Sequence, residues 1–358
     1  MTDPLLSVEN LRTHIHSGDG IVRAVDGVDL TVKRGETVCL VGESGSGKSL
    51  TCDTIAGLVD PQADISGSVR FDGRDVLPLE ERSRRSLRGD RIAYVFQNAQ
   101  SALDPVYTIG EQLIESIEFN RDVAAADPRH VAIELLREVG LSRPEERLDQ
   151  YPHELSDGMS QRVAIAIGLA GDPDLLIADE PTSALDLMVQ ARIIDVLADL
   201  KRRRELSMLL VTHDLRVAAA VADRIVVLYG GTPVERGPAA TVLEHPAHPY
   251  TRELLRTFVG EFPKSSDATH IPDHGCRFHR ECPLVEEQCR NGRPPFEVVD
   301  NNEDHTTACI YHETDRDPGA IAERIPVERI GEFEPDHMEN RPTSGNEDRD
   351  WPGNDSNV

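Results

Sequence analysis

Residues 38–52 read VCLVGESGSGKSLTC, and this stretch decides the fold that we expect. Its first four residues are apolar, which is typical of a buried parallel strand. Residues 42–49 match the phosphate-loop pattern G-x-x-x-x-G-K-[ST], and residues 50–58 continue with helical character. The glycines let backbone N–H groups turn toward a polyphosphate, Lys48 adds a positive charge, and Ser49 offers a hydroxyl to Mg²⁺. The order strand, loop, helix favours nucleotide binding over a glycine-rich turn with a chance Lys-Ser pair.

The composition limits the classes of protein to consider. The chain has 358 residues, 39% of them hydrophobic, which leaves room for an α/β domain with a smaller appendage. Its formal net charge of -26 argues against a surface that coats nucleic acid. Such acidity indicates either a halophilic protein, adapted to high cytoplasmic salt, or an ordinary acidic cytosolic protein with an acidic tail. We find no apolar run of membrane-spanning length and no secretory signal, so we expect a cytoplasmic protein whose membrane role comes through a partner.

The remaining pattern predicts a parallel core that is interrupted by a helical insertion. Alternating apolar residues predict a small antiparallel sheet over residues 5–34 and another strand pair over residues 65–76. Residues 101–171 are mostly helical in pattern. Elsewhere we expect strands at residues 91–97, 175–178, 208–212 and 225–228 and helices at residues 189–200 and 218–222.

Two carboxylates follow the strand expected at residues 175–178. Asp179 at the carboxyl end of a central strand can hold Mg²⁺ through water, and Glu180 can polarise an attacking water as a general base. An apolar strand that ends in Asp-Glu is common, but here PTSALD follows at 181–186 and LSDGMSQ precedes at 155–161. In the latter, Ser156 stands at an N-cap position before a helix whose N-terminus can bind a phosphate.

Taken in order, these motifs resemble those of the ATPase subunits of ABC transporters, over residues 5 to 250. The resemblance implies an α/β fold, the ABC ATPase nucleotide-binding domain. That fold has a RecA-like parallel core, an antiparallel β subdomain and a helical insertion, here at residues 99–171. The resemblance also implies ATP and Mg²⁺ as ligands, and a dimer in which two domains enclose two ATP molecules.

The same resemblance assigns roles to individual residues. Glu180 is the catalytic base, His213 the switch histidine that contacts the γ-phosphate, and Lys48 stabilises charge. Gln97 is the Q-loop glutamine and shares Mg²⁺ with Ser49 and Asp179. The nucleotide-binding set is Gly42, Glu43, Ser44, Gly45, Ser46, Gly47, Lys48, Ser49 and Gln97. The set that faces the ATP of a partner domain, from the signature and D-loop, is Ser156, Asp157, Gly158, Met159 and Asp186. Taken alone, His213 would by default be a satisfied buried histidine and Gln97 an ordinary polar strand end. The place of His213 after the LLVT strand favours the switch role.

Two features depart from the family pattern. Residue 157 is Asp where the family has Gly. Its carboxylate either repels the partner's γ-phosphate, which makes one composite site slow, or points to solvent. Residues 14–22 contain no aromatic side chain to stack on adenine, and Ile21 or Val22 is the candidate to pack there instead.

Two further segments indicate a branch of the family. QNAQSALDPVYTIGEQ at 97–112 and EHPAHPYTRELL at 244–255 are similar to the ATPase subunits of dipeptide and oligopeptide importers, which also include some nickel carriers. This resemblance implies two transmembrane permease subunits, an extracellular solute-binding protein and a location at the cytoplasmic face of the membrane. The sequence GMSQRV at 158–163 resembles that of one of the two unlike ATPase subunits that such importers often carry. We therefore expect a heterodimer with a second ABC ATPase subunit.

Four of the six cysteines cluster near the C-terminus, at Cys276, Cys282, Cys289 and Cys309, while Cys39 and Cys52 are expected to be small buried apolar residues. Clustered cysteines in a cytoplasmic protein favour metal ligation over disulfides. Four thiolates suit an iron–sulfur cluster or tetrahedral Zn²⁺, with free thiols as the remaining alternative. The spacing lacks the Cys-x₂-Cys knuckle usual for zinc. Resemblance to peptide importers favours a structural [4Fe–4S] cluster. We expect nearby His279 and His305 at the surface.

The predicted organisation is an ATPase domain at residues 1–255, a four-cysteine region at 256–313 and an acidic, disordered tail at 314–358. The main hypothesis is the ATP-hydrolysing subunit of a peptide-type importer. One alternative is a soluble ABC protein of DNA repair or translation, although such proteins usually carry two cassettes or a long coiled coil. Another is a regulatory ATP-binding subunit with weak turnover because of Asp157.

Overall fold

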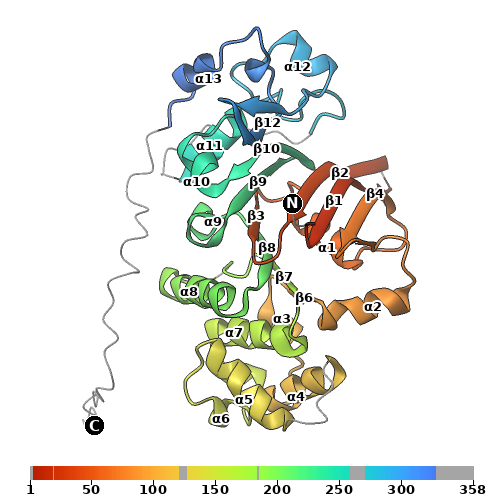
Figure 1. Ribbon diagram of the computed structural model, residues 1–358, viewed down its shortest axis with the longest axis vertical. Coiled ribbons are helices and arrows are strands. Elements are labelled where there is room, and N and C mark those ends of the chain that lie inside the picture. The colour runs from red at the N-terminus through yellow and green to blue at the C-terminus, as the bar shows by residue number, and fades with distance from the viewer. Residues whose placement is uncertain (1–2, 19, 121–126, 184, 259–270, 328–358) are drawn as a thin grey trace, which may run out of the picture.

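A computed structural model describes residues 3–18, 20–120, 127–183, 185–258 and 271–327. Its centre is an eight-stranded sheet with the order β11-β12-β10-β9-β3-β8-β7-β6 (Figure 1). The strands from β9 to β6 are parallel, and β10, β12 and β11 continue the sheet antiparallel. Their bounds are β3 Thr37–Val41, β6 Ile92–Val95, β7 Leu175–Asp179, β8 Ser207–Thr212, β9 Arg224–Tyr229, β10 Thr232–Pro238, β11 Glu297–Val299 and β12 Asn302–Thr307. Every residue of β3, β7 and β8 is buried, as continuous apolar runs in a parallel sheet require.

A second, four-stranded sheet has the order β2-β1-β4-β5. It is antiparallel and consists of β1 Leu6–Ser17, β2 Gly20–Val32, β4 Asp64–Phe71 and β5 Arg74–Asp75. Apolar residues of this sheet, of helix α1 (Lys48–Ala56) and of one face of the central sheet form a common core. The predicted antiparallel subdomain is confirmed, and it lies beside the start of α1 (Figure 1).

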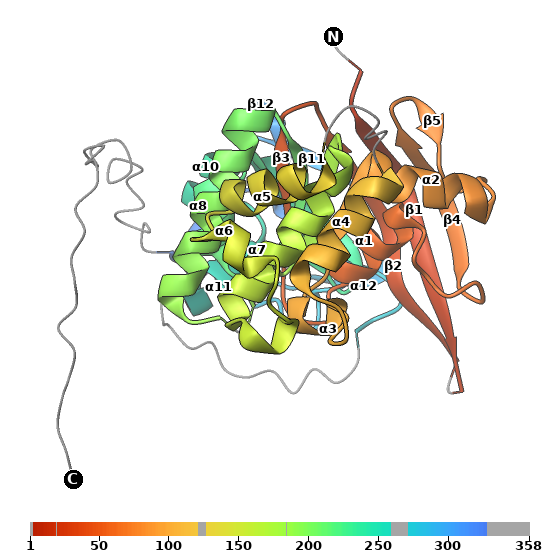
Figure 2. The same ribbon diagram turned by 90° about the horizontal axis from the view of Figure 1, so that it is seen from below.

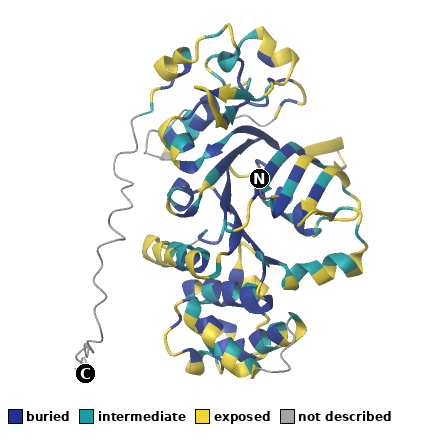
Figure 3. Ribbon diagram, viewed as in Figure 1, coloured by how far each residue is buried: buried dark blue, intermediate teal, exposed yellow. Residues whose placement is uncertain are grey.

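The helical insertion lies beyond the β6 edge of the central sheet (Figure 1). It comprises α3 Ala99–Ala102, α4 Ile109–Asn120, α5 Pro128–Glu138, α6 Pro144–Arg147 and α7 Asp157–Gly168, with short 3₁₀ turns at Pro152–Glu154 and Leu169–Gly171. Seen from below, α4, α5 and α7 lie in front of the central sheet, with β1, β2 and β4 to one side (Figure 2). The other helices of the domain are α2 Glu81–Asp90, α8 Leu187–Arg204 and α9 Leu215–Val221. Dark buried stripes on α7 and on the central strands mark the core between them (Figure 3).

The C-terminal region joins the opposite edge of the sheet. After α10 (Ala239–Glu244) and α11 (Pro249–Phe258), the chain forms α12 (Glu287–Asn291), and β12 pairs with β10 through Glu235↔Thr307 and Arg236↔Thr306. The four-cysteine region therefore contributes two strands, β11 and β12, to the edge of the central sheet. Among the described residues, no helix combines the length and apolar character needed to cross a membrane.

The first part of the predicted tail is folded. Helix α13 spans Gly319–Arg324, and the side chains of Ile321 and Ile325 are buried. Residues 328–358 of that predicted tail lie outside the described residues.

Candidate functional site

The phosphate loop follows β3 and requires glycine at two close approaches. Gly42 has φ 152° and Gly47 has φ 94°, both in the region that side chains disfavour. A Cβ atom at Gly42 would lie 2.2 Å from the Leu228 carbonyl oxygen, and one at Gly47 would lie 2.3 Å from that of Ala24. Gly45, between them, also has a positive φ of 78°. The loop can therefore fold back tightly over β9 and β2 before α1 begins.

Lys48 is the first residue of α1, and its side chain already reaches back across the loop. Its Nζ donates to the carbonyl oxygens of Gly42 at 2.8 Å and Glu43 at 2.7 Å, and to Ser46 Oγ at 3.4 Å. Burial lowers the pKa of Lys48, and the nearby carboxylates of Glu180, Asp179 and Glu43 oppose that shift. A buried ammonium held against carbonyl oxygens is placed to exchange those acceptors for phosphate oxygens.

Ser49 and Asp179 meet at the end of β7. Ser49 Oγ donates to Asp179 Oδ1 at 3.0 Å, which joins two segments far apart in the sequence. Burial raises the pKa of Asp179, and the hydrogen bond from Ser49 counteracts part of that shift. A hydroxyl and a carboxylate side by side are the oxygen ligands that Mg²⁺ prefers, so this pair fits the predicted metal position.

Glu180 is held between Gln97 and His213. Gln97 Nε2 donates to Glu180 Oε2 at 2.8 Å, and His213 Nδ1 lies 3.2 Å from Glu180 Oε1. Glu180 itself has a positive φ of 45°, and its N–H donates to the Val211 carbonyl oxygen at 2.9 Å. Strain of this kind in a residue that is not glycine is typical of functional positions. The structure thus brings together three predicted residues that lie far apart in the sequence.

These residues open onto a pocket of about 540 Å³. Its walls also include Asp157 and Gln161 of α7 and Ser183, whose Oγ donates to the Glu180 carbonyl oxygen at 3.0 Å. The pocket therefore joins the end of β7 to the helical insertion, where a water molecule next to Glu180 could be activated.

The signature residues form the N-terminus of α7. Ser156 is the N-cap, and its Oγ accepts from the Met159 N–H at 3.4 Å, while Asp157 is exposed in the first turn. Gly158 packs against α8, because a Cβ atom there would lie 2.3 Å from Val189 Cγ1. Asp186 caps α8 by accepting from the N–H groups of Met188 and Val189, each at 3.0 Å. The packing of α7 on α8 thus brings the signature close to the D-loop residue Asp186. The phosphate loop lies elsewhere, at the start of α1.

Comparisons with known proteins agree with this geometry. The family described as ABC transporter matches residues 25–183, and the family described as oligopeptide/dipeptide transporter, C-terminal region, matches residues 234–289. The dipeptide transport ATP-binding protein DppD of Escherichia coli is 40% identical over 305 residues, covering 82% of this chain and 93% of that protein. The oligopeptide transport ATP-binding protein AppD of Bacillus subtilis is 40% identical over 320 residues, covering 86% of this chain and 97% of that protein. The chain belongs to the ATP-binding subunits of ABC transporters.

A solved ABC cassette shares the fold. The ATP-binding cassette MJ0796, described as a dimer bound to ADP and phosphate, superposes with a TM-score of 0.59 at 31% identity, covering 65% of this chain and 98% of that one. The predicted ABC nucleotide-binding domain is therefore confirmed.

Sequence reasoning missed one contact to the phosphate loop of this ABC subunit. The N–H of Glu43 donates to Tyr250 Oη at 2.9 Å, and Tyr250 is fully buried in α11. The HPYT segment that contains Tyr250 indicated the branch of the family, but nothing in the sequence pointed to a contact with a loop 207 positions away. The Gly231 N–H likewise donates to the Ser46 carbonyl oxygen at 3.0 Å.

The segment expected to lie near adenine is a β-hairpin formed by β1 and β2. Ile15 pairs across it with Val22, and His16 pairs with Ile21. Ile15, Ile21 and Val22 are all exposed. Ile15 and Val22 form a cross-strand pair on one face of the hairpin, and Ile21 lies on the other face. An exposed aliphatic side chain can contact a flat base by dispersion, so Ile21 or Val22 stays the predicted contact for adenine.

The four C-terminal cysteines line one apolar pocket, together with Phe278, His248 and Pro294. All four are free thiols. Burial raises the pKa of Cys282 to about 12, and the neighbouring Cys276 and Cys289 add to that rise. Within the described part of the chain, no group of three or more His, Cys, Asp or Glu side chains is arranged to hold a metal ion. The four predicted ligands thus line one pocket, but their side chains do not form a metal-binding group there.

His305 is not at the surface, so that expectation is wrong. It is buried, and its Nε2 lies 2.8 Å from Oε1 of Glu235, a fully buried carboxylate on β10. The same carboxylate accepts from the N–H groups of Ala247 and His248, each at 2.8 Å. The pairing explains why a polar residue lies inside, because a buried charge is stable only when it has partners.

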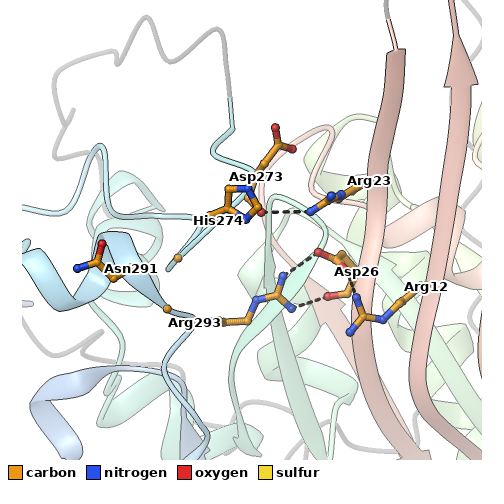
Figure 4. A pocket seen from close by; sticks show the side chains of 9 residues that line it. Arg12, Arg23, Asp26, Asp273, His274, Asn291 and Arg293 are labelled. Carbon is orange, nitrogen blue, oxygen red and sulfur yellow. Dashed lines mark hydrogen bonds and ion pairs between the residues drawn. The ribbon is translucent and has the colours of Figure 1, made fainter.

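A polar pocket of about 440 Å³ lies between the β1–β2 hairpin and the C-terminal region (Figure 4). At its base Asp26 of β2 accepts from Arg12 at 2.6 Å, from Arg277 at 2.7 Å and from Arg293 at 2.8 Å. Burial would raise the pKa of Asp26, but the hydrogen bonds from Arg277 and Arg293 outweigh it and lower the pKa to about 2. Asp26 thus fastens two arginines of the C-terminal region to the ATP-binding domain.

Proposed function

We propose that this chain is the ATP-hydrolysing subunit of a peptide importer and couples ATP binding and hydrolysis to uptake of peptides or a related solute. The observation that carries the proposal is the position of Glu180, held by Gln97 and His213 beside the Ser49–Asp179 pair. Its relatives named for dipeptide and oligopeptide transport support the solute class. The proposal includes two permease subunits, an extracellular solute-binding protein and a position at the cytoplasmic face of the membrane.

The residues of the site suggest how water attacks the γ-phosphate. Mg²⁺ bound by Ser49, Asp179 and Gln97 would neutralise charge on the phosphates. Lys48 binds phosphate oxygens in place of its present carbonyl partners. Glu180 accepts the proton of the attacking water, and Gln97 and His213 fix the orientation of its carboxylate. His213 is also half-exposed beside Glu180, where it can contact the γ-phosphate.

Hydrolysis also needs a second ATPase domain in this proposal. Ser156, Asp157, Gly158 and Met159 form a helix N-terminus that can bind a phosphate of the partner's ATP. The dimeric cassette bound to ADP and phosphate supports this arrangement. We infer a heterodimer, in which Asp157 places a carboxylate at one composite site and slows turnover there by repulsion.

Glu180→Gln tests the central role. The amide keeps the shape of the side chain but cannot accept a proton, so we expect hydrolysis by the assembled complex to fall by at least about 100-fold and ATP-bound dimers to accumulate. Glu287→Gln, an exposed carboxylate at the start of α12, is the matched control and should hydrolyse ATP like the wild type. Unimpaired turnover in Glu180→Gln would remove the assigned base. Recovery of nucleic acid or ribosomes with the chain, in place of permease subunits, would favour the soluble ABC alternative.

The four cysteines are proposed to hold a structural [4Fe–4S] cluster, with Zn²⁺ as the alternative. Their thiol donors suit either group, and their common pocket supports a shared site. A cluster takes one thiolate per iron and would stabilise the fold around the pocket, outside the path of hydrolysis. Anaerobic purification should give about four iron and four sulfide per chain, and Cys282→Ser should lower both. One zinc and no sulfide per chain would contradict the cluster.

The acidic composition is proposed to reflect a halophilic protein. At a net charge of -26, screening by salt should reduce self-repulsion. We expect the midpoint of thermal unfolding to rise between 0.1 and 2 M KCl, in scanning calorimetry at neutral pH, by several degrees. A midpoint that stays constant would indicate an ordinary acidic protein.

A further inference from the structure

We propose that Tyr250 is a positioning residue of the ATP site and that its hydroxyl holds the phosphate loop in the form that binds ATP. The inference rests on the proposed function, because it assumes that this loop binds the nucleotide. It adds a residue of α11 to a site otherwise made by the strands and loops nearer the start of the chain. Tyr250 lies in the segment matched by the oligopeptide/dipeptide transporter C-terminal region.

The outer part of the phosphate loop has little support of its own. Glu43, Ser44 and Gly45 are exposed, with Gly42 directly before them and Gly47 after Ser46. Because glycine permits many backbone conformations, such a loop loses considerable entropy when it closes on a ligand. A contact that fixes the loop beforehand therefore strengthens binding.

Glu43 is fixed at both of its backbone groups. Its N–H donates to Tyr250 Oη at 2.9 Å, and its carbonyl oxygen accepts from Lys48 Nζ at 2.7 Å. When phosphate draws Lys48 away from that carbonyl, the Ser46 N–H still donates to it at 3.2 Å, but that contact lies within the loop. The bond to Tyr250 ties Glu43 to a helix outside the loop. The hydroxyl therefore sets the path of the loop at the residue that follows Gly42.

The ring of Tyr250 is itself firmly held. It makes an edge contact with Tyr229 at a centroid distance of 4.6 Å, and Phe278 lies 5.5 Å from its centroid. Tyr229 and Phe278 also meet edge to face at 5.2 Å, so the three buried rings pack on one another. Phe278 in turn lines the cysteine pocket. Packed rings of this kind leave few rotamers, and the hydroxyl is presented to the loop with little loss of entropy.

Tyr250→Phe on the full chain isolates the hydroxyl, because the ring and its packing remain. We expect the Kd for Mg-ATP, measured by calorimetry, to rise about fivefold, the effect of losing one ordinary hydrogen bond. In the assembled complex the KM for ATP should rise by a similar factor with kcat unchanged, since the loop is positioned equally in the ground and transition states. Tyr311→Phe is the matched control. Tyr311 lies after β12, its hydroxyl donates to the Leu284 carbonyl oxygen at 3.3 Å, and the loss of that hydroxyl should leave the Kd unchanged.

The outcomes separate this inference from the proposed function. A wild-type chain that binds no Mg-ATP would contradict the proposed function. A wild type that binds Mg-ATP while Tyr250→Phe binds it equally well would overturn the role of Tyr250 alone. A fall in thermal stability of Tyr250→Phe well beyond that of Tyr311→Phe, or a fall in kcat in place of a rise in KM, would also overturn it, because the hydroxyl would then act on the fold or on the chemical step.

Discussion

Replacing Asp26 by Asn removes the charge that joins three arginines at the boundary between β2 and the C-terminal region. The pKa of Asp26 is lowered from 3.8 to about 2, and each unit is worth about 1.4 kcal/mol, so the ionised carboxylate stabilises the fold by about 2.5 kcal/mol at neutral pH. Arg277, also buried, would be left without its counter-charge, which adds to the loss. We expect Asp26→Asn to lower the free energy of unfolding by about 2–3 kcal/mol.

Urea unfolding followed by circular dichroism measures this difference at several pH values. A carboxylate with a lowered pKa contributes its full stability above the unfolded value of 3.8 and loses it as the pH falls toward 2. The gap between wild type and Asp26→Asn should therefore stay constant from pH 7 to about 5 and shrink below about 4. Asp64→Asn is the control, because Asp64 pairs with His16 at an exposed position and should cost less than about 1 kcal/mol. Equal losses in the two variants, or a gap as large at pH 3 as at pH 7, would refute the reasoning.

Two further variants test the ATP site. Gly47→Ala should weaken Mg-ATP binding more than about tenfold in calorimetry, because its Cβ would lie 2.3 Å from the Ala24 carbonyl oxygen at a φ of 94°; binding within twofold of wild type would contradict the required loop path. Asp157→Gly should raise phosphate release by the assembled complex several-fold by removing the repelling carboxylate, at a small cost to the N-terminus of α7; an unchanged rate would mean that Asp157 only faces solvent.

The parts of the site that the sequence could predict are those encoded by local pattern. The phosphate loop is a contiguous motif. Asp179 and Glu180 directly follow a run of four apolar residues, and such a run locates the end of a buried strand. Parallel strands bring their carboxyl ends to one edge of the sheet, so the motif order sufficed to place Ser49 near Asp179. The antiparallel sheet could also be predicted, from the alternation of apolar and polar residues along its strands.

The parts that could not be predicted depend on contacts between distant segments. Tyr250 reads as an ordinary core aromatic until the fold brings it to Glu43. His305 lies in the polar stretch NNEDHTTA, which reads as surface, and it is buried only because Glu235 pairs with it. No pattern within residues 302–307 reveals that they pair with β10. Pairing register of this kind is set by tertiary packing rather than by local propensity.

These distant contacts predict that the C-terminal region is required for a stable ATP-binding domain. Ending the chain after residue 258 would remove Arg277 and Arg293 from Asp26 and Phe278 from the aromatic cluster. It would also expose the edge of β10 and leave the fully buried Glu235 without His305, which is costly for a buried carboxylate. We expect residues 1–258 to aggregate or to unfold at least about 10 °C below the full chain in scanning calorimetry, and to bind Mg-ATP more weakly. A truncated chain that unfolds at the same temperature and binds Mg-ATP with the same Kd would show that the region is only an appendage.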